Sequence, residues 1–285
     1  VYYACSFSSF YKIKIMNIDT KLIDLFYKSE KKSVKWDKYF SVYEDLLSGY
    51  KNKKITFVEV GILNGGSLEI WKKYFGKDSR IIGIDKNPDC KKFESENCEV
   101  FIGSQSDPIF WEDFFHKVGN VDVILDDGGH TNEQQLTTLM ESLSFINNGG
   151  IHIVEDVHSS YLKHFGNPNK YSFINFSKKS IDDINFTFPK IGHFDSSLNK
   201  IVHSIEFFES IVAYKINRKL CIQNKFITNN GIDSNIDDVT FNSDFPDFEK
   251  KYSSLYKFKL VKKILRVFSI FLAKRRSRLL KKYFN

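Results

Sequence analysis

Two short clusters of carboxylates and histidines are the residues of this sequence best suited to chemistry. The first cluster contains Asp126, Asp127 and His130, and the second contains Glu155, Asp156 and His158. Carboxylates crowded together at the dry end of a strand repel one another unless a proton or a cation lies between them. Three of them, Asp127, Glu155 and Asp156, offer the oxygen ligands by which proteins hold Mg²⁺. We therefore predict a metal site, in preference to acids that only cap the following helices.

Each cluster follows a run of β-branched apolar residues, which is typical of a strand buried on both faces of a parallel sheet. The two runs are 121–125 and 151–154. Between them, residues 134–146 have apolar side chains at mostly helical spacing, and the pair Gly149-Gly150 stands where a helix stop is expected. In open α/β sheets ligands bind beyond the carboxyl ends of the strands. Both clusters should therefore face one crevice.

A strand, a glycine-rich turn and a helix precede these clusters, in residues 55–71. Gly61 and Gly65 allow the backbone to approach a ligand closely, and the following helix offers its N-terminal amides. The glycine spacing departs from the GxGxxG of dinucleotide-binding proteins. Just before the first glycine, Glu59 stands where a cationic amino group could be held.

The next two strands also end in polar residues. The strand RIIGID ends at Asp85, 24 residues beyond Gly61. An acid at about this distance commonly binds the two hydroxyls of an adenosine ribose. The strand that follows ends in GSQSD, where Gln105 and Asp107 could read the edge of an adenine.

Five motifs follow one another along the chain: EVGILNGG, GID, GSQSD, LDDGGH and VEDVHSSY. In this order they resemble the class I S-adenosylmethionine-dependent methyltransferases, specifically the metal-dependent sugar O-methyltransferases of macrolide tailoring and their cephalosporin-hydroxylase-like relatives. The resemblance covers residues 35–215. The chain departs from the family at Gly129, where serine is usual, and at Ser104, where an acidic residue is usual.

The resemblance implies a role for each cluster residue. Asp127, Glu155 and Asp156 match the metal ligands, and His130 matches the general base. The cofactor-binding residues that it implies are Glu59, Gly61, Gly65, Asp85, Gln105, Asp107, Asp126 and Tyr39. Among these, Glu59 matches the residue that holds the methionine amino group.

We expect an α/β fold with a Rossmann-like doubly wound sheet, a terminal antiparallel hairpin, N-terminal helices and a basic C-terminal helix. The expected segments are an N-terminal helical cap (1–50), the S-adenosylmethionine-dependent methyltransferase domain (51–222), a linker (223–250) and a basic amphipathic tail (251–285). Amphipathic spacing predicts two helices in the cap, at 18–27 and 36–47. The hairpin should turn at Glu209-Ser210, and a helix and a lid over the acceptor should lie within 161–200.

Composition limits the class of protein. The 285 residues are 42% hydrophobic, which is enough for a core and excludes wholesale disorder. The four cysteines form no CxxC pair, which argues against zinc or a disulfide framework and favours a reducing, cytoplasmic location. No apolar run approaches the length that spans a bilayer. We expect the native product to begin at Met16, because Met16 precedes a helix start. The residues before it lack the basic region and continuous apolar core of a signal peptide.

The tail from Lys257 to Asn285 contains eleven Lys or Arg residues and no acid. The whole chain has a net charge of +7, so removing these eleven leaves −4 for the rest, and no nucleic-acid partner is expected. Leu260, Ile264 and Phe268 recur at helical spacing, so a helix here would carry an apolar stripe beside a cationic face. We therefore predict peripheral contact with the inner face of the membrane. The alternative is packing on the domain or on a second subunit, and we also expect a homo-oligomer.

The predicted reaction is methyl transfer from S-adenosylmethionine to a sugar hydroxyl. A sulfonium methyl is already electrophilic, so the enzyme must align an oxygen with it and remove the proton of that oxygen. A bound metal, expected to be Mg²⁺, would acidify the hydroxyl, and His130 would take the proton.

Abundant Lys, Asn, Ile and Phe indicate an AT-rich genome. We therefore expect a bacterial surface glycan or its precursor as the acceptor, nucleotide-linked or polymer-bound.

Three alternatives stay open. A non-sugar diol, a catechol or another small natural product would be served equally well by the metal. The chain could also be a non-catalytic scaffold that keeps the fold. A hydride-transferring Rossmann enzyme is disfavoured by the glycine spacing.

Overall fold

The computed structural model describes residues 21–189, 198–232, 234, 251–252, 254–255 and 258–283. The expected start at Met16, residues 190–197 of the predicted lid and residues 235–250 of the predicted linker lie outside the described residues. The chain divides into two compact units, Val1–Lys225 and Phe226–Asn285.

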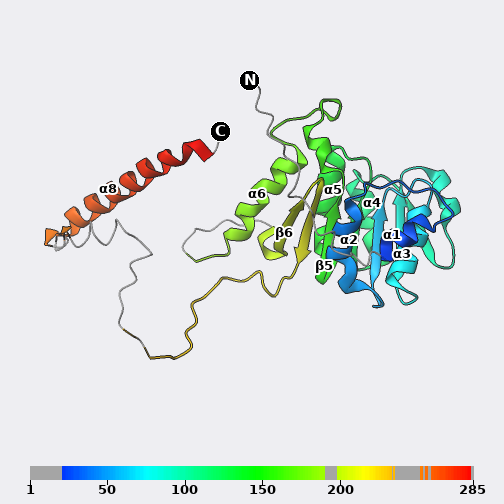
Figure 1. Ribbon diagram of the computed structural model, residues 1–285, viewed down its shortest axis with the longest axis horizontal. Helices are drawn as coiled ribbons and strands as arrows, with labels where there is room; N and C mark the ends of the chain where they lie inside the picture. Colours follow the sequence, from blue (N-terminus) through cyan, green and yellow to red (C-terminus); the bar gives the residue numbers. More distant parts are fainter. Residues whose placement is uncertain are drawn as a thin grey trace, which may run out of the picture. The chain divides into compact units, whose positions relative to one another are not determined.

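The described residues of the first unit form a sheet of seven strands in the order β3-β2-β1-β4-β5-β7-β6 (Figure 1). The strands are β1 (Thr56–Val60), β2 (Arg80–Asp85), β3 (Cys98–Ile102), β4 (Val121–Asp126), β5 (Ile146–Val154), β6 (Val202–Phe208) and β7 (Ile211–Ile216). β1 to β5 are parallel, whereas β7 is antiparallel to both β5 and β6. The chain reverses direction across the sheet between β1 and β4, the switch point where doubly wound sheets bind ligands. The predicted sheet and its terminal hairpin are confirmed.

Helices cover both faces of this sheet. They are α1 (Lys21–Tyr27), α2 (Tyr39–Leu47), α3 (Gly66–Phe75), α4 (Pro108–Val118), α5 (Asn132–Ser142) and α6 (Phe173–Asn185). Alternate residues of β1 point to opposite faces: Phe57 packs in the core with Trp71 of α3, and Val58 packs in the core with Trp111 of α4. Leu22 of α1 belongs to the same core as Phe57, so the N-terminal helices are part of the sheet's own packing.

Polar residues after β3 and β4 start the helices that follow. Asp107 caps α4, since its side chain accepts a hydrogen bond from the amide of Ile109. Thr131 and Gln134 cap the start of α5 reciprocally, each side chain accepting from the other's backbone amide. These caps fix where α4 and α5 begin: α4 starts beyond β3, and α5 starts just beyond the end of β4, which carries the first predicted cluster.

The structure corrects the prediction for the end of α5. We predicted a helix over 134–146 with Gly149-Gly150 as its stop, but α5 ends at Ser142 and both glycines lie inside β5. They form a bulge: Val121 of β4 pairs with Ile146, and the next pair joins Val123 to Ile151. Gly149 has a φ of 85°, which is why glycine is needed there. A glycine pair marks a bulge as readily as a helix end.

The segment between α1 and α2 is irregular, because α2 begins at Tyr39 and not at Trp36 as its apolar spacing predicted. Lys35 and Trp36 therefore lie before the helix, and their side chains reach the carboxyl edge of the sheet. There Lys35 donates a hydrogen bond to Asp127, and Trp36 donates one to Asp156.

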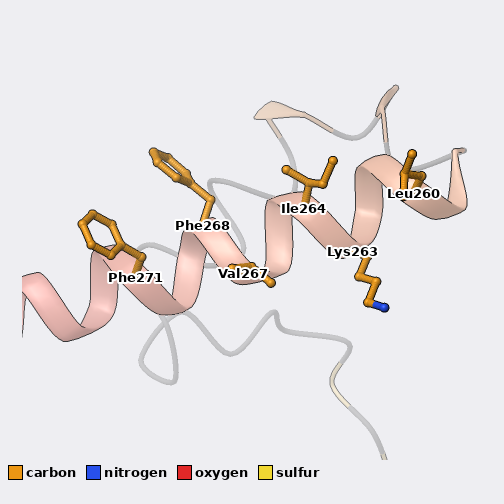
Figure 2. A pocket seen from close by; sticks show the side chains of 6 residues that line it. All are labelled: Leu260, Lys263, Ile264, Val267, Phe268 and Phe271. Atoms are coloured by element: carbon orange, nitrogen blue, oxygen red, sulfur yellow. The ribbon is translucent and has the colours of Figure 1, made fainter.

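In the second unit, α8 (Lys259–Ser277) is the principal described element. Leu260, Ile264 and Phe271 project from one side of it, and Lys263 projects from another (Figure 2). The three apolar side chains are exposed, between 57% and 71%. The predicted amphipathic helix is thus present. None of the helices in the described ranges is long and apolar enough to cross a membrane.

Candidate functional site

Asp127, His130 and Asp156, here called the triad, form the group best suited to a metal ion. Asp127 directly follows β4, and Asp156 lies two residues beyond the end of β5. These parallel strands are neighbours whose last residues pair with each other, so both acids lie at one edge of the sheet. One ligand atom from each triad residue lies within 4.8 Å of the other two. The two clusters of the sequence therefore meet at one site, as predicted.

Two residues of the triad have a left-handed backbone. The φ angle is 58° at His130 and 53° at Asp156. Residues other than glycine seldom adopt this region, and those that do are concentrated at functional sites. The surrounding contacts must therefore hold both residues in place.

Asp156 is held by two donors from the segment around the start of α2. Its Oδ1 accepts hydrogen bonds from Tyr39 Oη at 2.5 Å and from Trp36 Nε1 at 3.2 Å. Its Oδ2 lies 3.4 Å from Nε2 of His130. Burial and the hydrogen bond to Asp156 raise the pKa of Tyr39, so its hydroxyl stays protonated and donates. The protein thus fixes one oxygen of Asp156 and turns the other toward His130.

Lys35 is a site residue that the sequence did not reveal. Its Nζ lies 2.6 Å from Asp127 Oδ2 and 3.0 Å from Glu155 Oε2, and its side chain is only 6% exposed. Glu59 Oε1 is 3.9 Å away. Burial lowers the pKa of Lys35, but attraction to Glu155 and its neighbours outweighs this and raises the pKa well above its usual value. In the sequence Lys35 stands in a lysine-rich stretch, where nothing distinguishes it from solvated neighbours.

Glu155 lies beside the triad and is not part of it. Its side chain is buried, Tyr43 Oη donates to Oε1 at 2.5 Å, and Lys35 donates to Oε2. The ligand role that the sequence gave to Glu155 therefore stays a prediction. In its place, the structure adds the imidazole of His130 to the two aspartates.

Glu59 is fully buried at the middle of the sheet, on β1. Ser67 Oγ donates to its Oε2 at 2.6 Å, and Trp71 Nε1 donates to its Oε1 at 3.2 Å. Burial raises the pKa of Glu59 to about 7, although Lys35 lowers it. Glu59 was expected to hold the amino group of the cofactor's methionine, and this role stays a prediction; in the structure the cation near its carboxylate is the ammonium of Lys35.

A pocket of about 360 Å³, here called the glycine pocket, lies at the carboxyl ends of β1, β2 and β4. Gly61, Asp85 and Gln105 of the predicted cofactor set line it, and so do Asp127 and His130 of the triad. At Gly61 the φ angle is 86°, and a Cβ would lie 2.2 Å from the carbonyl oxygen of Asp127. Only glycine fits there, and it allows the turn after β1 to pack directly against the backbone of Asp127.

Other residues of the predicted cofactor set have structural partners. Gly65 has a φ of 65° and precedes the first residue of α3. Asp107 is exposed and caps α4. Asp126 is buried, which raises its pKa to about 7, and its Oδ1 accepts a hydrogen bond from Gln105 Nε2 at 2.9 Å. The side-chain Oε1 of the same glutamine accepts from the amide of Gly129 at 2.7 Å, so Gln105 shapes the loop that carries the triad.

A second pocket of about 460 Å³, here called the aromatic pocket, adjoins Asp156. Trp36, Tyr39, His158 and Tyr161 are among the residues that line it. The first two hydrogen-bond Asp156, and His158 Nδ1 lies 3.8 Å from Asp156 Oδ1. The sequence did not single out Trp36 or Tyr161, because aromatic residues are more often part of a core.

The triad joins the two pockets. Asp127 and His130 line the glycine pocket, and Asp156 contacts three residues that line the aromatic pocket. A molecule in each pocket would therefore meet the other at the triad. This arrangement suits the transfer of a group from one bound molecule to another beside a bound cation.

No family model matches the chain. Among curated relatives, 8-demethyl-8-alpha-L-rhamnosyl tetracenomycin-C 2'-O-methyltransferase of Streptomyces olivaceus is 26% identical over 185 residues, 61% of this chain and 48% of the relative. Demethylmacrocin O-methyltransferase of Streptomyces fradiae is 29% identical over 131 residues, 44% of this chain and 33% of the relative. The chain thus spans about half the length, or less, of these relatives.

The fold is also found among solved structures. The MycE methyltransferase from the mycinamycin biosynthetic pathway, in complex with Mg and SAH, matches with a TM-score of 0.62 at 20% identity. The match covers 70% of this chain and 54% of MycE. The chain therefore has the class I methyltransferase fold, and its sequence relatives are sugar O-methyltransferases of antibiotic tailoring. The resemblance indicated by the five motifs is confirmed.

Proposed function

We propose that this protein is a metal-dependent O-methyltransferase that moves a methyl group from S-adenosylmethionine to a sugar hydroxyl. The observation that carries the proposal is the triad of Asp127, His130 and Asp156, which joins the glycine pocket to the aromatic pocket. A methyl donor in one pocket and a hydroxyl in the other would meet there. The relatives are named as O-methyltransferases, which supports the reaction class.

S-adenosylmethionine is assigned to the glycine pocket. Gly61 lets the backbone approach the cofactor, and Asp85 offers a carboxylate to the ribose hydroxyls. The proposed contact set also contains Glu59, Gly65, Gln105, Asp107, Asp126 and Tyr39. The SAH bound to MycE supports this choice of cofactor.

The donor set of the triad fits a divalent cation, with Mg²⁺ as the proposed ion. Its two carboxylates supply the oxygen ligands that Mg²⁺ prefers. Nδ1 of His130 is buried and finds no hydrogen-bond partner among the described residues. We assign Asp127 and Asp156 as ligands with Glu155 as the third. The ion would supply acidification of a hydroxyl that contacts it.

His130 is assigned as the general base. Its Nε2 lies 3.4 Å from Asp156 Oδ2, an acceptor that can orient the ring and stabilise it once protonated. As the hydroxyl oxygen bonds to the methyl carbon, the carbon–sulfur bond breaks and its electrons stay on sulfur. The hydroxyl proton passes to His130, and S-adenosylhomocysteine leaves.

The acceptor is proposed to be a sugar of a bacterial surface glycan or its precursor. The choice of a sugar rests on the relatives, whose names describe O-methylation of a rhamnosyl tetracenomycin and of demethylmacrocin. The choice of a glycan rests on the composition. Its 28 Phe and abundant Lys, Asn and Ile are typical of an AT-rich genome, for which a bacterial glycan is a more expected acceptor than a macrolide.

The tail is proposed to hold the enzyme at the inner face of the membrane. Exposed Leu260, Ile264 and Phe271 share one side of α8, and the helix contains basic residues but no acid (Figure 2). An apolar stripe beside a cationic face binds anionic lipid surfaces. Association with a second copy through the same stripe is the alternative, in line with the expected homo-oligomer.

The reaction is tested by methyl transfer to simple glycosides, measured by mass spectrometry with excess Mg²⁺ or with a chelator. Asp127→Ala should abolish transfer, and His130→Ala should lower it by about 10²–10⁴-fold, the usual contribution of a general base. Calorimetry should show that both variants still bind S-adenosylhomocysteine. Full activity in chelator would remove the metal from the proposal, and failure to bind either cofactor form would overturn it.

A further inference from the structure

The aromatic pocket has aromatic walls that are open to a ligand. Trp36 is 59% exposed and Tyr161 is 56% exposed, although both are large apolar side chains. Trp36 is also fixed, because its Nε1 donates to Asp156 and its ring packs edge-on against His158, with centroids 6.0 Å apart. A rigid, exposed indole beside a catalytic carboxylate is suited to the apolar face of a sugar ring, whose hydroxyls lie around its rim.

The charged groups of this pocket are mostly negative. Asp37 and Glu209 line it, and Asp156 lies against its wall. Lys38 is the sole Lys or Arg among the described lining residues, and its Nζ is already paired with Glu209 at 2.5 Å. Binding of a phosphate requires unpaired cations or open helix amides. The described lining residues offer neither an unpaired lysine nor an arginine, and Nδ1 of His158, which also lines the pocket, already contacts Ser210 Oγ at 2.5 Å.

The start of α2 does not supply an anion site either. Its first two amides, those of Tyr39 and Phe40, already donate to the carbonyl oxygens of Trp36 and Asp37, at 3.1 and 3.4 Å. A sugar phosphate carries about −1.5 to −2 charges at neutral pH. In this pocket such a group would lie near three carboxylates and would be repelled.

We propose that the aromatic pocket takes an uncharged pyranose of a glycoside or glycan, stacked on Trp36, and rejects sugar phosphates and nucleotide sugars. The assignment rests on the proposed function, and it selects the polymer-bound or aglycone-linked acceptor over the nucleotide-linked one. Tyr161 provides a second aromatic wall. A hydroxyl of the stacked ring can then approach Asp156 and the triad.

The position of Trp36 gives the test a direct signal. The chain has three tryptophans, all within the described residues, and the other two, Trp71 and Trp111, are 2% and 1% exposed. A ligand in the aromatic pocket should therefore change the fluorescence of Trp36 and leave that of the other two unchanged. Trp36→Phe should abolish the change.

The experiment titrates the full chain with matched pairs that differ in charge: the methyl glycosides of glucose, mannose and rhamnose, and the corresponding 1-phosphates. We expect at least one glycoside to produce a saturable change and its phosphate to bind at least about tenfold more weakly, a difference of about 1.4 kcal/mol. In the double variant Asp37→Asn, Glu209→Gln, which frees Lys38, the phosphate should gain about tenfold while the glycoside changes little. Glu112→Gln, an exposed acid on α4, is the control and should change neither.

Tighter binding of the phosphates, or no response to any glycoside, would overturn the proposal. The proposed function fails separately. If glycosides bind but are not methylated, the pocket assignment stands and the reaction is wrong. If a nucleotide sugar is methylated efficiently, the reaction stands and the pocket assignment is wrong.

Discussion

At the scale of single residues, Lys35 explains how three acids share a buried site. Asp127, Glu155 and Glu59 all lie within 4 Å of its Nζ. Carboxylates this close repel one another strongly in a site of low dielectric. The ammonium group therefore keeps the site assembled before any other cation binds.

Lys35→Met should destabilise the protein by about 3–5 kcal/mol in the absence of metal, the usual cost of removing one partner of a buried ion pair. Thermal unfolding with a chelator measures this loss, and added Mg²⁺ should recover part of it. Lys31→Met is the matched control, because Lys31 pairs with Glu69 at the surface, where both are about 40% exposed. That change should cost no more than about 1 kcal/mol. Equal losses in the two variants would contradict the role of Lys35.

Glu59 should make the stability of the metal-free protein depend on pH. Its pKa is raised to about 7 in the folded chain from 4.5, so the folded state binds more protons than the unfolded state between these values. Its contribution to stability therefore falls as pH rises from 4.5 to 7 and is constant above, by up to about 3 kcal/mol. Glu59→Gln should flatten this part of the profile in chemical denaturation at a series of pH values. An unchanged slope would show that Glu59 is charged throughout.

At the scale of elements, the ends of the strands were predictable, but the path of the irregular segment before α2 was not. The apolar runs located β4 and β5, and the ends of neighbouring parallel strands must meet, so the meeting of the two clusters at one edge of the sheet followed from the pattern. Lys35 and Trp36 could not be found in this way. They reach the site through an irregular segment, and only long-range packing decides where such a segment runs.

The glycines give a test of the turn after β1. Gly61 and Gly149 have almost the same φ, 86° and 85°, but a Cβ at Gly61 meets the carbonyl oxygen of Asp127 at 2.2 Å, and a Cβ at Gly149 meets nothing within 4 Å. Alanine at either position carries the left-handed cost of about 1–2 kcal/mol. Gly61→Ala should cost about 1–3 kcal/mol more, since backbone must move. It should also weaken S-adenosylhomocysteine binding in calorimetry, which Gly149→Ala should not. Equal effects would show that the turn has room to move.

At the scale of the whole molecule, the sequence anticipated that the excess of positive charge belongs to the tail. The eleven Lys and Arg residues from Lys257 onward turn a chain of −4 into one of +7. Helical spacing was enough to predict α8, because an amphipathic pattern needs no tertiary information. What the stripe binds is a different question, since the same pattern serves a lipid surface and a second helix.

Flotation with vesicles separates these two partners of α8. The full chain should float with anionic vesicles at low salt and lose binding as salt rises. Ile264→Ser with Phe271→Ser should remove most of the binding, while Ile232→Ser, an exposed change in the same unit outside α8, should not. If the wild-type protein stays in solution and sediments as a dimer that the double variant abolishes, the stripe is an interface between copies.

The irregular segment before α2 also affects the order in which the site can form. Lys35 and Trp36 are made early, but their partners Asp127, Glu155 and Asp156 come 92 to 120 residues later in the chain. At ordinary rates of synthesis that interval lasts on the order of ten seconds. Contacts between such distant residues also form slowly, because a long loop must close first. The nascent chain therefore cannot assemble its acidic site until β4 and β5 have both left the ribosome.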